Sequence, residues 1–148
     1  MPHYLDYAAT SALRPPQVHA AVRQYLEKTG ATPGRGGYQL AIEAGRTVRA
    51  AREAVHSVLG LPGESARLTF SSNATTPLNH VLQRVLAPGD VLVVTDFDHN
   101  AVLRPADWLR RRADVRVRHV HGRADGRPIE SAFSEALRGA RLVSLNAV

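Results

Sequence analysis

The chain has 148 residues, of which 44% are hydrophobic and 22% are charged, as in a single folded globular domain. It has no cysteine, which excludes disulfides and thiolate metal sites here. It has neither a signal-peptide pattern nor an apolar run near the roughly 20 residues that span a membrane, so we expect a cytoplasmic location and no membrane partner. The net charge of +6 leaves a basic nucleic-acid-binding domain open as an alternative, but we do not favour it because the arginines are scattered and aromatic residues make up only 5%.

Residues 1–60 predict an extended segment followed by two helices. The short apolar stretch 4–9 is typical of extended chain. Pro15 and Pro16 open a helix whose apolar residues recur every three or four positions until Gly30. A glycine-rich loop at 32–37 precedes a longer helical pattern over 38–59, and Gly60 ends it.

Residues 61–148 change to a regular alternation of strands and helices. Strands are predicted at 67–70, 91–95, 115–120 and 142–145, with helices at 75–86, 102–112 and 129–138. This order is typical of the α/β class, with a mostly parallel sheet between two helical layers. The apolar run of residues 91–94 predicts a buried central strand. The sequence stops in or just after a strand, so we expect 61–148 to be the first part of a larger domain.

Polar residues follow the first of these strands, over positions 71–76, just before a helix. In open α/β sheets ligands bind beyond the carboxyl ends of the strands. Backbone N–H groups at a helix N-terminus bind phosphate, and small hydroxyl side chains add donors. The same residues are also preferred helix caps, so the pattern permits either an anion site or plain capping.

A second polar group, Asp96, Asp98 and His99, follows the strand at 91–95. A histidine there can stack on a flat ligand, act as an acid or base near neutral pH, or bind a metal. The three side chains together could hold a divalent ion. A metal-dependent phosphoesterase-like domain is therefore a second hypothesis, although no further acidic or histidine cluster completes such a site.

Taken in order, four segments resemble the N-terminal part of the class V aminotransferase group of pyridoxal-phosphate enzymes, nearest the cysteine desulfurases. Residues 4–10 are similar to "YLD-x-AATT", and 32–37 to "NPGRGG". Residues 70–79 match "FTSGATE-x-x-N", and 98–102 match "EH-x-AV". Each motif alone is weak, but the four occur in the family's order and spacing.

The resemblance implies a fold-type-I large domain and the cofactor pyridoxal 5'-phosphate. Ala74 and Thr75 would bind the cofactor phosphate, and His99 would stack on the pyridine ring and move protons as the catalytic residue. The substrate would be a small amino acid, with cysteine favoured, although a lyase or aminotransferase reaction is also open. The family usually forms homodimers, which we expect of the full-length enzyme.

Three positions depart from the family pattern. Asn73 replaces a glycine, which is tolerated if the position needs a positive φ, because asparagine adopts left-handed geometry more readily than most residues. Thr76 replaces a glutamate, and Asp98 is a shorter acid than the usual glutamate. These changes put the substrate in doubt more than the cofactor.

The family's Schiff-base lysine, its acid beside the pyridine nitrogen and its sulfur-accepting cysteine all come later than residue 148. Asn146 aligns with the first residue of "NHASNV", whose cofactor-binding asparagine would follow Val148. Lys28 is the single lysine among 19 basic side chains, and it does not lie at the family's lysine position. We therefore expect these 148 residues to be inactive on their own.

Overall fold

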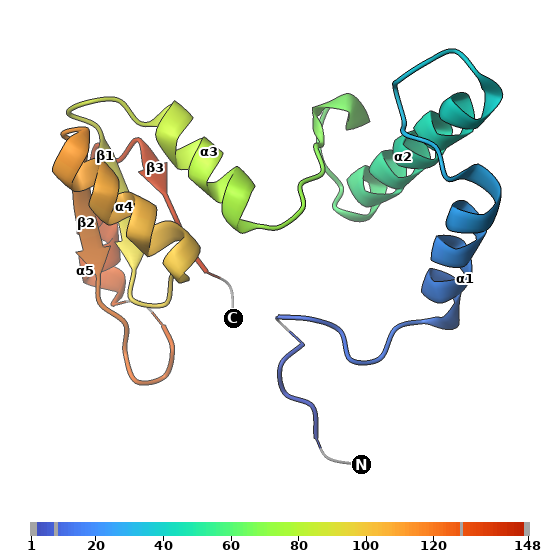
Figure 1. The fold of residues 1–148 in the computed structure, drawn as a ribbon. Helices are drawn as coiled ribbons and strands as arrows, with labels where there is room; N and C mark the ends of the chain where they lie inside the picture. Colours follow the sequence, from blue (N-terminus) through green and yellow to red (C-terminus); the bar gives the residue numbers. More distant parts are fainter. Residues whose placement is uncertain (1–2, 8, 128, 147–148) are drawn as a thin grey trace. The chain divides into compact units, whose positions relative to one another are not determined.

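The computed structural model describes residues 3–7, 9–127 and 129–146. It separates into two compact units, residues 1–69 and residues 70–148, which are drawn together in Figure 1 and are described separately here. The expected boundary between residues 1–60 and residues 61–148 stays a prediction. Within the described part of the chain, no helix is long and apolar enough to cross a membrane.

The N-terminal unit contains the two predicted helices. Helix α1 spans Pro16–Gln24 and continues as a π-helical turn, η1, over Tyr25–Thr29. Gly30 ends it with a φ of +52°, a conformation that glycine adopts without steric cost. Helix α2 spans Gln39–Val58, and a short 3-10 turn, η2, follows at Ser65–Arg67. Both helices confirm the periodic patterns and the glycine stop signals.

The segment expected to be extended near the N-terminus instead turns. The backbone N–H groups of Ala9 and Thr10 both donate to the carbonyl of Asp6, at 3.1 and 3.2 Å. The rings of Tyr4 and Tyr7 meet edge to face, with centroids 4.9 Å apart. Residue 8 of this segment lies outside the described residues. Local hydrogen bonds therefore replace the extended conformation that the apolar run indicated.

The C-terminal unit alternates helices and strands, as the green-to-red part of the ribbon shows (Figure 1). Its elements are α3 (Thr75–Val85), β1 (Val91–Thr95), α4 (Asn100–Arg112), β2 (Arg116–Val120), α5 (Glu130–Ala136) and β3 (Leu142–Val143). The strands form one parallel sheet in the order β2-β1-β3. Leu92 lies opposite Val117 on one side and Leu142 on the other. The predicted parallel sheet with a buried central strand is confirmed.

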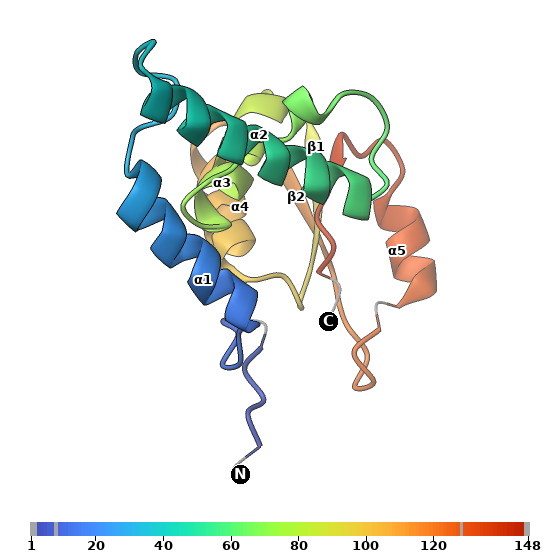
Figure 2. The same ribbon diagram turned by 90° about the vertical axis from the view of Figure 1, so that its right-hand side faces the viewer.

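Helices cover both faces of strand β1, so the C-terminal unit has three layers, with the sheet in the middle. Leu92 and Val94 pack with Leu82 of α3 and Leu109 of α4. The alternate residues, with Val93 among them, pack with α5 on the opposite face, through a cluster comprising Val91, Val93, Val120, Ala136 and Phe133. Figure 2 gives the view turned by 90°, in which α5 and the helices α3 and α4 are drawn on different sides of the strands. Successive strand residues point to opposite faces, so an unbroken apolar run suits a strand between two helical layers.

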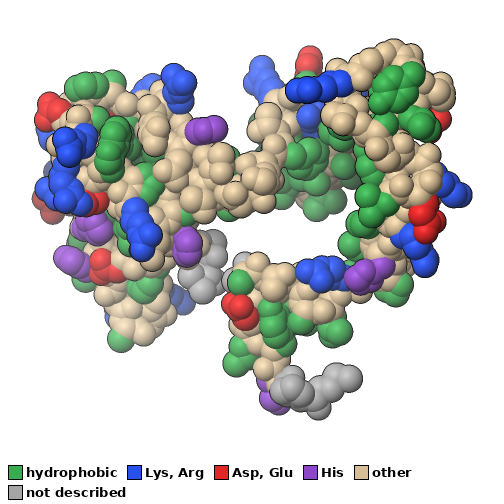
Figure 3. All heavy atoms as spheres, viewed as in Figure 1, with side chains coloured by type: hydrophobic (Ala, Val, Ile, Leu, Met, Phe, Trp, Pro, Cys, Tyr) green, Lys and Arg blue, Asp and Glu red, His purple; other side chains and the backbone are tan. Residues whose placement is uncertain are grey.

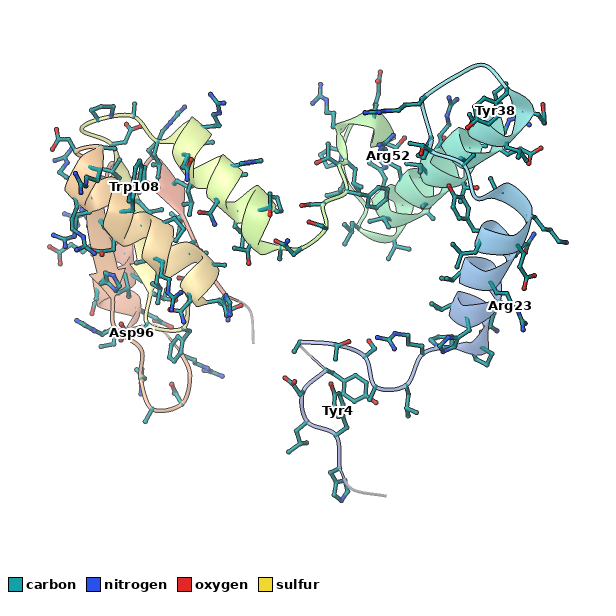
Figure 4. The ribbon with its side chains drawn as sticks, in the orientation of Figure 1. Tyr4, Arg23, Tyr38, Arg52, Asp96 and Trp108 are labelled. Carbon is teal, nitrogen blue, oxygen red and sulfur yellow. The ribbon has the colours of Figure 1, made fainter. Side chains whose placement is uncertain are left out.

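The predicted strand at 67–70 is wrong. Arg67 ends the η2 turn, and the sheet of the described residues contains only β1, β2 and β3. Both edges of β1 are already paired, with β2 and β3, so this segment has no place beside the central strand. The Arg52 side chain reaches from α2 instead, and its Nε donates to the Leu68 carbonyl at 2.7 Å (Figure 4).

Candidate functional site

The loop before α3 places Thr75 at the first turn of that helix, directly after Ala74. Asn73 supplies the cap: its Oδ1 accepts the Thr76 N–H at 2.9 Å and the Thr76 hydroxyl at 3.1 Å. Within the described residues, the Thr75 N–H and hydroxyl have no assigned protein acceptor. First-turn N–H groups have no partner inside their own helix, so these donors face whatever lies at the helix N-terminus.

Asn73 does not have the positive φ that the resemblance allowed. Among the described residues other than glycine, only Asp114 has a positive φ. Asparagine is therefore useful at position 73 for its side-chain oxygen, which a glycine would lack. Its amide nitrogen also donates to the Ser72 hydroxyl at 3.1 Å. The departure from the family pattern is a helix cap rather than a substitute for a left-handed glycine.

His99 lies directly before α4, in the connection that follows β1. Its Nδ1 accepts the backbone N–H of Ala101 at 3.1 Å, so the imidazole caps the helix. An acceptor at Nδ1 fixes the tautomer of the neutral ring, because the proton must then be on Nε2. The ring nitrogen that remains for a ligand is therefore a donor.

Thr75 and His99 line the same cavity, whose volume is about 320 Å³. The other lining residues come from α3 and α4, namely Asn79, Asn100, Ala101, Arg104 and Pro105. The Asn79 amide nitrogen bridges the two helices, since it donates to the Thr75 carbonyl at 2.9 Å and to the Ala101 carbonyl at 3.3 Å. Two residues that are 24 positions apart in sequence thus share one cavity within the size range of small-molecule sites.

Asp98 is not presented to this cavity as a ligand. Its side chain is buried, with 7% exposure. One oxygen, Oδ2, accepts the Thr95 N–H at 2.7 Å and the Thr95 hydroxyl at 3.0 Å. The other, Oδ1, accepts the Ser144 hydroxyl at 2.5 Å. Asp98 therefore joins the end of β1 to the residue that follows β3.

Asp96 faces a different set of groups, beyond the end of β2, and is labelled in Figure 4. Its Oδ2 lies 3.1 Å from His121 Nδ1 and accepts the Gly122 N–H at 3.2 Å, while Oδ1 lies 3.9 Å from His119 Nδ1. The hydrogen bond with His121, helped by the Gly122 N–H and the charge of both histidines, lowers the pKa of Asp96. Neither histidine is assigned a role from the sequence, although His119 and His121 are two positions apart, a spacing that places side chains on one face of an extended chain.

This geometry does not favour the metal hypothesis. Asp98 turns to Thr95 and Ser144, Asp96 turns to His121, and His99 uses Nδ1 to cap α4. No group of three or more histidine and acidic side chains among the described residues is arranged to hold a metal ion. Asp96, Asp98 and His99 are close in sequence, but the tight turn after β1 directs their side chains to different partners.

Basic side chains do not gather into one patch on the face in Figure 3, where lysine and arginine are mixed with hydrophobic and acidic groups. On α4, Arg110 and Arg111 both pair with Asp107. Arg118 of β2 donates to the carbonyls of Ala136 and Arg138 at 2.8 and 2.7 Å. Several arginines thus serve local structure, which gives the nucleic-acid hypothesis no support.

Comparisons with known proteins agree with the fold. A probable cysteine desulfurase of Methanothermobacter thermautotrophicus is 33% identical over 91% of the chain. The cysteine desulfurase structure from Thermococcus onnurineus NA1 matches 93% of the chain with a TM-score of 0.83 and 27% identity. A C-DES mutant with glycine covalently linked to its PLP cofactor matches 86% of the chain and 32% of its own, with a TM-score of 0.62, but at 18% identity it bears on the fold alone.

The chain spans about a third of the length of these relatives, 34% of both the archaeal desulfurases named above. The family model of the class-V aminotransferases matches residues 3–148, almost every residue of the chain. The chain therefore belongs to the class-V aminotransferase family.

Proposed function

We propose that these residues supply the phosphate-binding and ring-stacking part of a pyridoxal-phosphate enzyme of the cysteine desulfurase type. The observation that carries the proposal is the shared cavity of Thr75 and His99 between α3 and α4. Ala74 and Thr75 would bind the cofactor phosphate, and His99 would stack on its ring.

The residues present fit this part of the cofactor. Asn73 satisfies Thr76 but leaves the Thr75 N–H and hydroxyl for an anion at the N-terminus of α3. The helix dipole favours negative charge at that point. His99, at the neighbouring helix start, offers a flat ring whose orientation is fixed by Ala101. An anionic group on a flat aromatic ring matches the two halves of the cavity.

When bound, pyridoxal phosphate withdraws electrons from the bonds around the α-carbon of an amino acid. The residues of this chain would bind and orient it. Thr75 would fix the phosphate with a hydroxyl and an N–H donor, and His99 would limit the ring to one plane. Because Nδ1 is engaged, His99 would hold or move a proton through Nε2.

The substrate and the assembly are proposals too. Cysteine is favoured because the relatives in the comparisons are named cysteine desulfurases. A homodimer of the longer protein would cover apolar side chains that are exposed in the N-terminal unit, including Val22, Leu26 and Val58 at 56, 69 and 86% exposure.

A binding experiment tests the phosphate role of Thr75. Titration of the chain with pyridoxal phosphate should show weaker binding by Thr75→Ala, because a hydrogen bond to a charged group worth about 1.5–3 kcal/mol is lost. Pyridoxal, which has no phosphate, should bind both proteins equally. Thr47→Ala is the matched control, since its hydroxyl donates to the Glu43 carbonyl within α2. Equal pyridoxal-phosphate affinity of the wild type and Thr75→Ala would contradict the assignment.

A further inference from the structure

Asp98 is a buried carboxylate for which the proposed function has no use. Three donors surround it: the Thr95 N–H, the Thr95 hydroxyl and the Ser144 hydroxyl. No ion pair to Asp98 occurs among the described residues, so the hydrogen-bond partners of its oxygens are all neutral groups. Burying an acid in this way is costly compared with an apolar side chain of similar size. A residue kept at that cost needs a role beyond filling space.

The position of Asp98 in the chain suggests that role. Its N–H donates to the Thr95 carbonyl at 3.1 Å, which closes the turn after β1, and its carboxylate holds both Thr95 and Ser144. The next residue, His99, has an extended backbone and attaches its ring to Ala101 of α4. Asp98, which is bonded to the strand ends, and His99, which is bonded to α4, are thus joined by a single peptide bond.

We infer that Asp98 is a positioning residue, which with Ser144 sets the orientation of the His99 imidazole in the cavity it shares with Thr75. Ser144 directly follows β3 and is 46 residues away in sequence, so the ring orientation depends on β3 being paired with β1. The ligand role of His99 rests on the proposed function, whereas the coupling of Ser144 to the ring does not need a ligand.

Ser144→Ala in the 148-residue chain is the first test, because it removes one donor to Asp98 without changing any residue of the turn that carries His99. The readout is the imidazole nitrogen and Ala101 amide resonances in NMR spectra recorded without cofactor. The wild type should show the single tautomer protonated at Nε2. In Ser144→Ala the two ring-nitrogen shifts should move toward each other and the Ala101 amide should shift. Asp98→Asn should do the same, because the amide has one acceptor oxygen where the carboxylate has two, so the hydrogen bonds to Thr95 and Ser144 cannot all be kept in their present direction.

Ser134→Ala, an exposed serine of α5, is the matched control and should leave these signals unchanged. If Ser144→Ala lowers the unfolding midpoint but leaves the His99 and Ala101 signals in place, Asp98 is only structural and the inference is overturned. If Asp98→Asn does not fold, Ser144→Ala decides alone. Pyridoxal-phosphate titration of the wild type is a separate arm, whose failure would count against the proposed function and not against this coupling.

Discussion

At the scale of single residues, the loop before α3 provides a helix cap and a proposed anion site with different atoms. Capping and anion binding are alternatives for the same run of small polar residues when only the sequence is considered. In the structure the Asn73 side chain accepts hydrogen bonds from the Thr76 N–H and hydroxyl, and the Thr75 N–H and hydroxyl are left for a ligand. The cap therefore supports the proposed phosphate site instead of competing with it.

Asn73→Ala should lower the free energy of unfolding by about 1 kcal/mol, within the range of roughly 0.5–2 for lost caps. The reason is that the Thr76 N–H loses its acceptor at the exposed end of α3. Urea denaturation measures the change, with Ser71→Ala as a control at a neighbouring exposed serine. Equal stability of the two variants would show that the Asn73 cap contributes nothing.

The site could be predicted only where neighbouring residues carry the information. The motifs around Thr75 and His99 single out both residues before any coordinates, and in the structure each stands at the start of a helix beside one cavity. Their roles toward a cofactor stay predictions. Ser144 gives no such signal. Its contact with Asp98 exists only because β3 pairs with β1, and the sequence does not reveal which strands are neighbours.

At the scale of elements, burial on two faces explains which strand predictions were correct. All five residues of β1 are buried, so its apolar run is unambiguous. β2 has the pattern of an edge strand, with exposed arginine and histidine between apolar residues. The short run at 67–70 has similar composition, but strand formation depends on a partner, and in the described residues β1 is already flanked on both sides.

The contact between Asp96 and His121 should make stability depend on pH. Folding lowers the pKa of Asp96, so the folded state binds its proton less readily than the unfolded state. The stabilisation is therefore present above the ordinary aspartate pKa of about 3.9 and is lost as the pH falls through the lower folded value. The difference in unfolding free energy between wild type and Asp96→Asn should shrink below about pH 4. A difference that stays constant down to about pH 2 would contradict this.

At the scale of the whole molecule, the chain combines a small buried core with many exposed large apolar side chains. Leu92, Val93 and Val94 are completely buried in the C-terminal unit, so that unit has a core of its own. Lys28, the single lysine, is exposed in η1 of the N-terminal unit. Among the described residues, no hydrogen bond or ion pair is assigned to its side chain.

The 148-residue chain should therefore be catalytically silent. Mixed with pyridoxal phosphate and cysteine, it should release no more sulfide than pyridoxal phosphate alone, because no activated lysine accompanies the proposed site. Lys28→Arg is the control for incidental reaction at the only lysine and should behave like the wild type. Sulfide release above the cofactor background, lost in Lys28→Arg, would show that Lys28 carries chemistry after all.

The most direct test of the central claim is to map where pyridoxal phosphate binds, by NMR titration of the isotopically labelled chain. We expect the largest shifts at the Thr75 amide and the His99 imidazole, and we expect these two shifts to saturate together. Inorganic phosphate should shift Thr75 but leave the His99 ring largely unchanged. Shifts that centre on Lys28, or that leave Thr75 and His99 unmoved at saturation, would contradict the account.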